Sequence, residues 1–290
     1  MIRVLMNILI TGANGQLAKE FQRYFEHTGT HRITALSKRE LDISDFDSVS
    51  AALSGSRPSI VINCAAYNLV DRAEDDRDAA FNVNAAGVKN LAALCRKNKA
   101  FLIHYSTDYV FDGTKENYYT EADSTYPLNV YGESKLSGEQ LLREESDDFL
   151  LFRVSWVFGQ GTASFLYKLS EWAKDRDVLK IVCNQVSVPT YTNDIVKYTI
   201  AACDRGLRGL YHLTNGGYAS RYEVARYYIE RLGLKRTVLP ADSHFFNELA
   251  RRPYFSAMSN EKLSRELGVE MPEWTDAVDR FIKNQAKSEK

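Results

Sequence analysis

Tyr131 and Lys135 are the residues of this sequence best suited to acid–base chemistry at a carbonyl oxygen. Residues four apart lie on one face of a helix, so the Lys135 ammonium can lower the pKa of the Tyr131 phenol and also bind ribose hydroxyls. This spacing also arises by chance in a chain with 17 tyrosines. Thr107 strengthens the interpretation, because it ends an apolar strand and could bind the oxygen that Tyr131 protonates.

A glycine turn near the start of the chain indicates a phosphate site. The segment TGANGQLA (11–18) follows the first apolar run and opens a helix. Its glycines let a pyrophosphate approach the helix N-terminus, where free N–H groups favour an anion. The spacing is G-x-x-G-x-x-A, and an ordinary strand–helix connection can also hold two glycines. The position after the first strand favours a dinucleotide, and the predicted contacts are Gly12, Asn14, Gly15, Gln16 and Leu17.

The segment after the second strand predicts which dinucleotide binds. An acidic residue there would bind the adenosine ribose of NAD, but this chain has Ser37, Lys38 and Arg39. Two cations suit a 2′-phosphate and favour NADP(H), with NAD(H) also allowed. The alternative is a solvated charged turn. Asp42 and Ile43 follow, and we expect them to contact the adenine.

Trp156 and Arg252 are predicted to bind the substrate. Trp156 follows the fifth strand, where its indole offers a flat apolar wall and one N–H donor. Arg251 and Arg252 lie far along the chain, and a guanidinium suits a diphosphate. The alternative is that Trp156 belongs to the core and both arginines are surface charges.

The elements that must position these residues alternate along the first half of the chain. Short apolar runs, typical of strands buried on both faces of a parallel sheet, alternate with helical patterns, so we predict a Rossmann-like, doubly wound α/β fold. The predicted strands are Asn7–Thr11, Arg32–Leu36, Ile60–Cys64, Phe101–Ser106 and Phe149–Ser155. The predicted helices are Gln16–Glu26, Phe46–Ser54, Arg77–Lys99 and Leu128–Glu145.

The second half has a looser pattern that predicts a smaller C-terminal α/β lobe. We expect helices at Phe165–Lys174, Thr192–Cys203, Ser220–Leu232, Asn260–Leu267 and Glu273–Gln285, and extended segments at Val178–Cys183 and Leu210–Thr214. Residues 1–155 are thus expected to bind NADP and residues 156–290 mainly the substrate. No linker marks a clean boundary, so the chain could cross between the two lobes.

Composition excludes several classes of protein. The chain has 290 residues, 44% hydrophobic and 26% charged, which is typical of a soluble globular protein and not of a disordered one. The formal net charge of −1 gives no field that would attract nucleic acid or a membrane surface. The four cysteines form no metal-ligand or redox motif, and the five histidines lack ligand spacing. We therefore expect reduced thiols, no metal and a cytoplasmic protein.

Together these motifs resemble the dTDP-4-dehydrorhamnose reductase family of the extended short-chain dehydrogenase/reductase superfamily. The resemblance covers nearly the whole chain and rests on GANGQL (12–17), NCAAY (63–67), YSTDYVFDG (105–113), YGESKL (131–136) and RVSWVFG (153–159). It implies NADPH-dependent reduction of the 4-keto group of dTDP-4-dehydro-L-rhamnose, in dTDP-rhamnose and polysaccharide biosynthesis. The implied catalytic residues are Thr107, Tyr131 and Lys135. Further implied cofactor contacts are Ala65, Ala66, Tyr67 and Tyr105, and Thr107, Asp108 and Trp156 would hold the sugar.

The chain departs from the family pattern at a few positions. Ala18 stands where the superfamily usually has a third glycine. Some members form metal-bridged homodimers; Glu20 matches one acidic position, but Asn193 stands where a second is expected. Two other functions stay open: another nucleotide-sugar reductase or epimerase, and a non-catalytic NADP-binding regulatory subunit. The intact Thr107, Tyr131 and Lys135 argue against the second.

Overall fold

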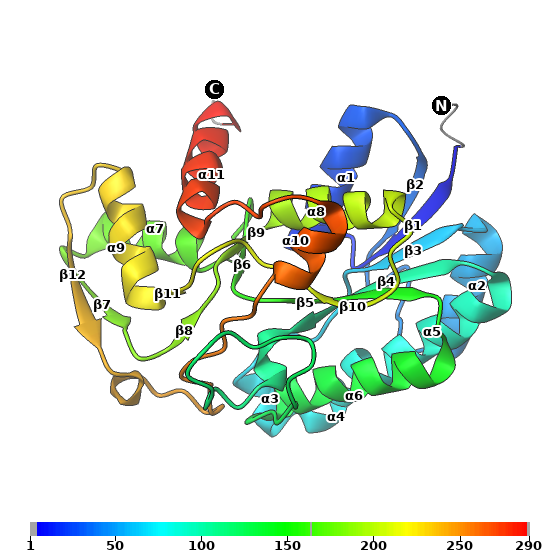
Figure 1. Cartoon of the computed structure of the whole chain (residues 1–290), viewed down its shortest axis with the longest axis horizontal. Helices are drawn as coiled ribbons and strands as arrows, with labels where there is room; N and C mark the ends of the chain where they lie inside the picture. The colour runs from blue at the N-terminus through cyan, green and yellow to red at the C-terminus, as the bar shows by residue number, and fades with distance from the viewer. Residues whose placement is uncertain (1–4, 163, 289–290) are drawn as a thin grey trace.

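A parallel six-stranded sheet organises the larger part of the molecule (Figure 1). The computed structural model describes residues 5–162 and 164–288. The strand order is β2-β1-β3-β4-β5-β10, and all neighbouring pairs are parallel. The strands are β1 (Asn7–Thr11), β2 (Arg32–Leu36), β3 (Ile60–Asn63), β4 (Phe101–Thr107), β5 (Phe149–Val154) and β10 (Gly209–His212).

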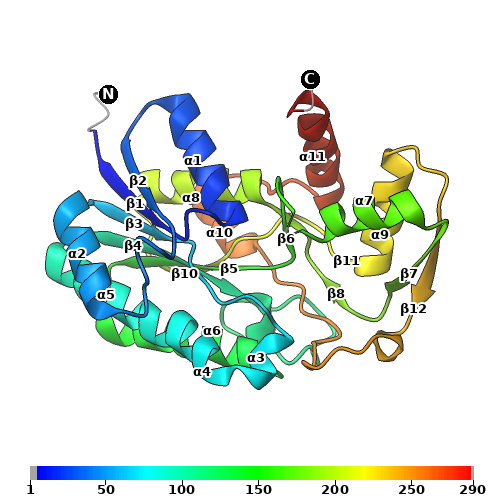
Figure 2. The same cartoon turned by 180° about the vertical axis from the view of Figure 1, so that it is seen from behind.

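Helices cover both faces of this sheet because successive strand residues point to opposite sides. Ile8 and Ile10 of β1 pack into one apolar cluster, and Leu9 between them packs into another. The first cluster includes α1 (Gln16–Thr28), α8 (Thr192–Asp204) and α10 (Glu261–Leu267). The second includes α2 (Phe46–Ser56), α5 (Gly87–Asn98) and α6 (Val130–Glu145). Both views show these two layers (Figures 1 and 2). The predicted doubly wound fold is confirmed.

A second, smaller group of elements lies beside the carboxyl end of the sheet and has its own apolar core (Figure 2). The chain enters it after β5, returns to the sheet with β10, and leaves again. Its helices are α7 (Phe165–Asp175), α9 (Arg221–Arg231) and α11 (Trp274–Ser288). Its strands are β6 (Val157–Phe158), β7 (Val178–Val182), β8 (Val186–Ser187), β9 (Thr190–Tyr191), β11 (Ala219–Ser220) and β12 (Thr237–Ala241).

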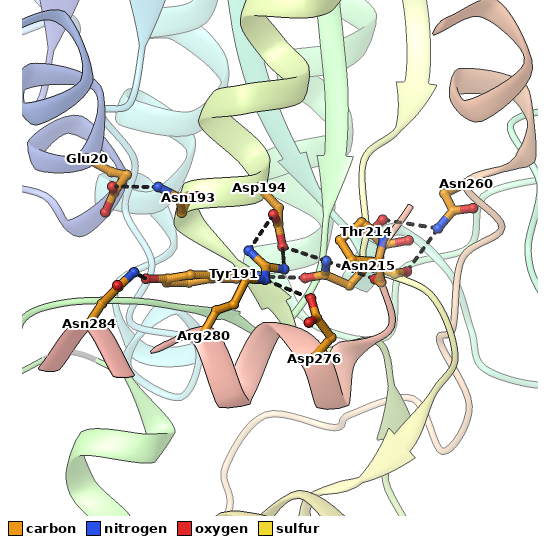
Figure 3. A network of polar contacts seen from close by, with 11 residues as sticks. Glu20, Tyr191, Asn193, Asp194, Thr214, Asn215, Asn260, Asp276, Arg280 and Asn284 are labelled. Atoms are coloured by element: carbon orange, nitrogen blue, oxygen red, sulfur yellow. Dashed lines mark hydrogen bonds and ion pairs between the residues drawn. The ribbon is translucent and has the colours of Figure 1, made fainter. Parts of the chain in front are cut away.

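A polar network fastens α11 to α8 and to the segment after β10 (Figure 3). Arg280 donates from Nη1 and Nη2 to the two oxygens of Asp194, at 2.9 and 2.7 Å. Asp194 also accepts from Asn215 Nδ2 at 2.8 Å, and Asp276 accepts from Arg280 Nε at 2.7 Å. Because Asp194 is buried, its bonds with Arg280 and Asn215 compensate the cost of burying its charge. The network therefore fixes the smaller group of elements against the sheet.

The predicted helix Arg77–Lys99 is helical from Arg77 to Asn98, but it is not α-helical throughout. The structure has α4 (Arg77–Phe81), a π-helical turn (Asn82–Ala86) and then α5, preceded by a short α3 (Arg72–Asp75). A π-helical turn inserts a residue without changing the apolar pattern enough to reveal it. α6 begins at Val130, two residues later than predicted, because the Asn129 side chain caps it through Gly132 N. No helix of the described residues is long and apolar enough to cross a membrane.

Candidate active site

The predicted site residues gather at the carboxyl edge of the sheet. The chain turns from β1 to β2 on one side and to β3 on the other, so a crevice opens between β1 and β3 where ligands bind in such sheets. The glycine turn follows β1, the Ser37–Arg39 segment follows β2, and Ala65–Tyr67 follows β3. Thr107 ends β4 at the same edge.

The turn after β1 has the geometry of a phosphate cradle. Gly12 has φ +65°, and a Cβ there would lie 2.8 Å from the backbone nitrogen of Ala65, so glycine is required where β1 and β3 end side by side. Gly15 is the N-cap of α1 and makes no capping bond with a side chain. The first turn of α1 has no acidic residue and leaves N–H groups available to an anion. These residues fit a dinucleotide pyrophosphate.

The segment after β2 carries both cations and an acidic residue, Glu40. Lys38 and Arg39 are exposed. Glu40 accepts from Ser37 N and Oγ at 2.8 and 2.7 Å, and these bonds lower the pKa of its carboxyl group. Glu40 is thereby held in the turn and is available only in part to a ribose. The exposed cations fit a 2′-phosphate.

The two expected adenine contacts, Asp42 and Ile43, have other partners in this structure. Asp42 accepts from Ser44 N and Oγ at 3.0 and 2.6 Å. The side chain of Ile43 is 2% exposed and packs against Gly87, so it belongs to the core.

Asn84, in the π-helical turn, holds the segment after β3. Its Oδ1 accepts from Tyr67 N at 2.9 Å, and its Nδ2 donates to Tyr67 O at 2.8 Å and to Ser134 Oγ at 3.0 Å. One buried amide thus joins the predicted cofactor segment 65–67 to the helix that carries Tyr131 and Lys135. Ala65, Ala66 and Tyr67 themselves follow the carboxyl end of β3.

Tyr131 lies in the first turn of α6 and faces the end of β4. Burial raises the pKa of its phenol, and a hydrogen bond with the Thr107 side chain opposes that rise. Lys135 is 2% exposed, and its Nζ donates to the backbone carbonyl of Tyr105 at 2.6 Å. Burial lowers the pKa of Lys135 to about 8, against an opposing effect of Glu139. The neighbouring Asp108 and Tyr109 raise the pKa of Tyr131 further, so its net shift is upward and not the lowering expected from Lys135.

Asp108 is buried behind Thr107 and joins the two groups of elements. Its Oδ2 accepts from Ser187 Oγ at 2.9 Å and from Ser256 Oγ at 2.6 Å, and its Oδ1 accepts from Thr107 Oγ1 at 3.2 Å. Asp108 is only 2% exposed, and burial raises its pKa despite these three bonds. The carboxylate predicted to hold the sugar is therefore occupied in orienting Thr107.

A pocket of about 440 Å³ opens between β6, α7, β7 and the N-terminus of α9. Trp156, Arg221 and Arg252 line it, as expected for Trp156 and Arg252 and unexpectedly for Arg221. Tyr109 connects the pocket to Tyr131: the charges of Arg221 and Arg252 act on its phenol, and its ring lies edge-on to the Tyr131 ring at 5.9 Å. Tyr109 thus interacts both with the arginines of the pocket and with the predicted acid.

The two arginines of the pocket differ in their partners. Arg252 donates from Nη2 to Asp71 Oδ2 at 2.7 Å and from Nη1 to the Ala250 carbonyl at 3.1 Å, with Glu248 3.1 Å from Nη1. Its guanidinium is thus neutralised and ties the 248–253 segment to the region after β3. Arg251 is exposed. Only a tertiary structure could reveal Arg221, since it lies 65 residues beyond Trp156 in the chain.

The structure offers no metal site at Glu20. Its carboxylate accepts from Thr192 Oγ1 at 3.2 Å and from Asn193 Nδ2 at 3.5 Å (Figure 3). Arg23 also donates to it at 2.5 Å. Three donors in place of further carboxylates do not fit a divalent cation. Within the described residues, no three His, Cys, Asp or Glu side chains form a group that could hold a metal ion.

Comparison with known proteins places these features in one family. Residues 6–287 match the family model described as the RmlD substrate binding domain. A dTDP-4-dehydrorhamnose reductase of Burkholderia thailandensis is 36% identical, over 96% of this chain and 99% of that protein. A dTDP-4-keto-6-deoxy-D-glucose reductase of Streptomyces niveus is 34% identical, over 93% of this chain and 94% of that protein. The crystal structure of dTDP-4-dehydrorhamnose reductase from Bacillus anthracis in complex with NADP superposes with a TM-score of 0.94 at 34% identity, covering 97% of this chain and 100% of that one.

Proposed function

The chain belongs to the RmlD substrate binding domain family, and we propose that it reduces the 4-keto group of dTDP-4-dehydro-L-rhamnose to give dTDP-L-rhamnose. Bound NADPH would supply the hydride for the keto carbon. The observation that carries the proposal is the hydrogen bond between Tyr131 and Thr107 at the end of β4. The Tyr109 ring contacts the Tyr131 ring, and the charges of Arg221 and Arg252 in the pocket act on its phenol. The sugar would therefore meet the acid beside Tyr109.

Tyr131 is suited to give a proton to the oxygen that becomes the alkoxide. Burial keeps its phenol protonated at neutral pH, which is the form that donation requires. Thr107, held by Asp108, would hydrogen-bond the same oxygen. Lys135 would bind the nicotinamide ribose and add positive charge near the phenol after it loses its proton. The glycine turn after β1 would hold the pyrophosphate of the cofactor, and Lys38 and Arg39 would hold its 2′-phosphate.

We propose the same division of labour along the chain: residues 1–155 bind the cofactor and residues 156–290 mainly bind the sugar nucleotide. The pocket supports it, because its lining residues all fall between Trp156 and Arg252. A homodimer and a cytoplasmic location are also proposals. The four free cysteines agree with a reducing compartment.

The direct test follows NADPH oxidation by absorbance with dTDP-4-dehydrorhamnose and, in parallel, with GDP- and UDP-linked 4-keto sugars and dTDP-4-keto-6-deoxy-D-glucose. We expect kcat/KM to be highest for dTDP-4-dehydrorhamnose. A higher value for another keto sugar would assign that sugar as substrate. Binding of NADPH without turnover of any sugar would favour the regulatory subunit.

A further inference from the structure

Arg221 is the one arginine lining the pocket that makes no hydrogen bond or ion pair with the residues described in the structure. Its guanidinium lies over the Trp156 ring at 4.2 Å and near the Phe165 ring at 5.2 Å. Both faces of an arginine can be covered by aromatic rings while its N–H edge stays free to donate. The edge of Arg221 is therefore available to a ligand.

The electrostatic balance of the pocket favours an anion. Glu248 is the acidic residue of the lining, and its carboxylate is already bound by Arg252 and by Gln185 at 2.8 Å. Lys168 and Lys180 add exposed positive charges at the rim. A partly buried guanidinium without a counter-ion is costly, and a bound anion removes that cost.

The backbone at Trp156 is strained, which is a second sign that this residue belongs to a binding site. Trp156 has φ +39°, in the left-handed region that a side chain rarely adopts. Such strain persists where the surroundings determine the conformation, and it is concentrated at binding sites. Here it places the indole beneath Arg221, where the ring fixes the direction of the guanidinium.

We propose that Arg221, supported by Trp156 and Phe165, is the residue that binds the diphosphate of the nucleotide sugar. The inference rests on the proposed function and assigns to Arg221 the role that the sequence suggested for Arg252. The surroundings of Tyr109 agree with it, because the charge of Arg221 acts on its phenol and its ring contacts the Tyr131 ring. The reacting C4 and the phosphate-bearing C1 lie on opposite sides of a hexose ring, so the acid and the residue that binds the diphosphate must be different groups.

The test measures the affinity of the whole protein for dTDP by calorimetry, in the parent and in Arg221→Met and Arg221→Lys. Arg226 is an exposed arginine on the same helix, so Arg226→Met removes the same charge outside the pocket. We expect Arg221→Met to raise the Kd for dTDP about 10- to 100-fold, the loss typical of a charge-assisted hydrogen bond. Arg221→Lys should have a smaller effect, and Arg226→Met less than about twofold.

Two readouts separate this inference from the proposed substrate. NADPH affinity should stay unchanged in all variants, and a parallel loss of NADPH binding and thermal stability would assign Arg221 to packing and overturn the inference. Equal dTDP affinity in Arg221→Met and parent would also overturn it. If the parent bound UDP or GDP more tightly than dTDP and Arg221→Met weakened that binding, the proposed substrate would fail while the diphosphate role of Arg221 would stand.

Discussion

At the scale of single residues, Tyr131 is distinguished by an environment that keeps its phenol protonated while Thr107 supplies a hydrogen bond. We predict that Tyr131→Phe lowers kcat about 10²- to 10⁴-fold, the usual contribution of a positioned general acid. The Kd for NADPH should change little, because the ring remains. Steady-state kinetics and NADPH titration measure both, with exposed Tyr126→Phe as the matched control. More than about a tenth of the parental kcat in Tyr131→Phe would rule out the role.

Lys135 gives the site a predicted alkaline limit. Its pKa is lowered to about 8 by burial, so its ammonium is lost as pH rises through that value. Because binding of the ribose needs the charged form, kcat/KM for NADPH, which reports on the free enzyme, should fall about tenfold per pH unit well above pH 8. Lys135→Arg stays charged and should lack this limb. A flat profile from pH 7 to 10 in the parent would contradict the assignment.

The cofactor preference depends on Lys38 and Arg39, whose exposed side chains follow β2. Replacing both by Ala should raise the Kd for NADPH about 10- to 100-fold, because each charge-assisted contact with a 2′-phosphate is lost. The Kd for NADH serves as the internal control and should not change. Equal affinity of the parent for the two cofactors would refute the preference.

At the scale of elements, α6 can approach its neighbours closely because of two glycines. A Cβ at Gly132 would lie 2.3 Å from the Tyr109 carbonyl oxygen, and one at Gly138 would lie 2.0 Å from the Asn84 carbonyl oxygen. Both contacts are with backbone, which cannot move aside cheaply. The close approach places Tyr131 and Lys135 against the end of β4 and lets Asn84 Nδ2 reach Ser134 Oγ of α6.

We therefore predict that Gly138→Ala destabilises the protein by about 1–3 kcal/mol, the usual cost of overpacking. Gly55 lies in α2 with open space around it, so Gly55→Ala tests the same substitution without a clash. Its better helix propensity should stabilise the protein by up to about 1 kcal/mol. Urea unfolding of the two variants measures both. Similar unfolding free energies for Gly138→Ala and the parent would show that α6 does not depend on this approach.

Long strands and local motifs were predictable from the sequence, whereas two-residue strands and contacts between distant residues were not. The bounds predicted for β1 to β5 agree with the structure to within one residue, because each strand has at least three apolar residues within four to seven positions. β6, β8, β9 and β11 have two residues each, too short for any periodicity, and β12 is an edge strand with exposed residues. Thr107, Tyr131 and Lys135 stand in local motifs that a sequence displays. The free guanidinium of Arg221 and the occupied one of Arg252 depend on which residues meet in space, which one sequence does not show.

At the scale of the whole molecule, acid stability depends on two histidines buried in the sheet. Burial, and then the charge of Arg153, lowers the pKa of His212 to about 3. Burial, and then the charge of Lys135, lowers that of His104 well below its usual value. His212 lies on β10, which returns from the second half of the chain, and His104 lies on β4. The pH dependence of stability at these two residues therefore depends on a sheet to which both halves of the chain contribute strands.

The sign of the pH effect follows from proton binding. Below an ordinary histidine pKa of about 6.5 the unfolded chain binds a proton at each position and the folded chain does not, so stability is lost as pH falls from about 6.5 toward the folded pKa. Each histidine contributes at most about 1.4 kcal/mol per pH unit in that window. Carboxyl groups with lowered pKa, such as Asp71 and Asp123, act only below about pH 4.

We predict that the free energy of unfolding of the parent falls between pH 7 and pH 5, and that His212→Leu reduces this fall by about 2 kcal/mol, since one buried histidine then no longer takes up a proton on unfolding. Urea unfolding at the two pH values measures the difference. His27→Gln is the control, because the His27 ring is exposed and the slope should persist without it. An unchanged slope in His212→Leu would mean that His212 is already protonated in the folded sheet, contrary to its burial beside Arg153.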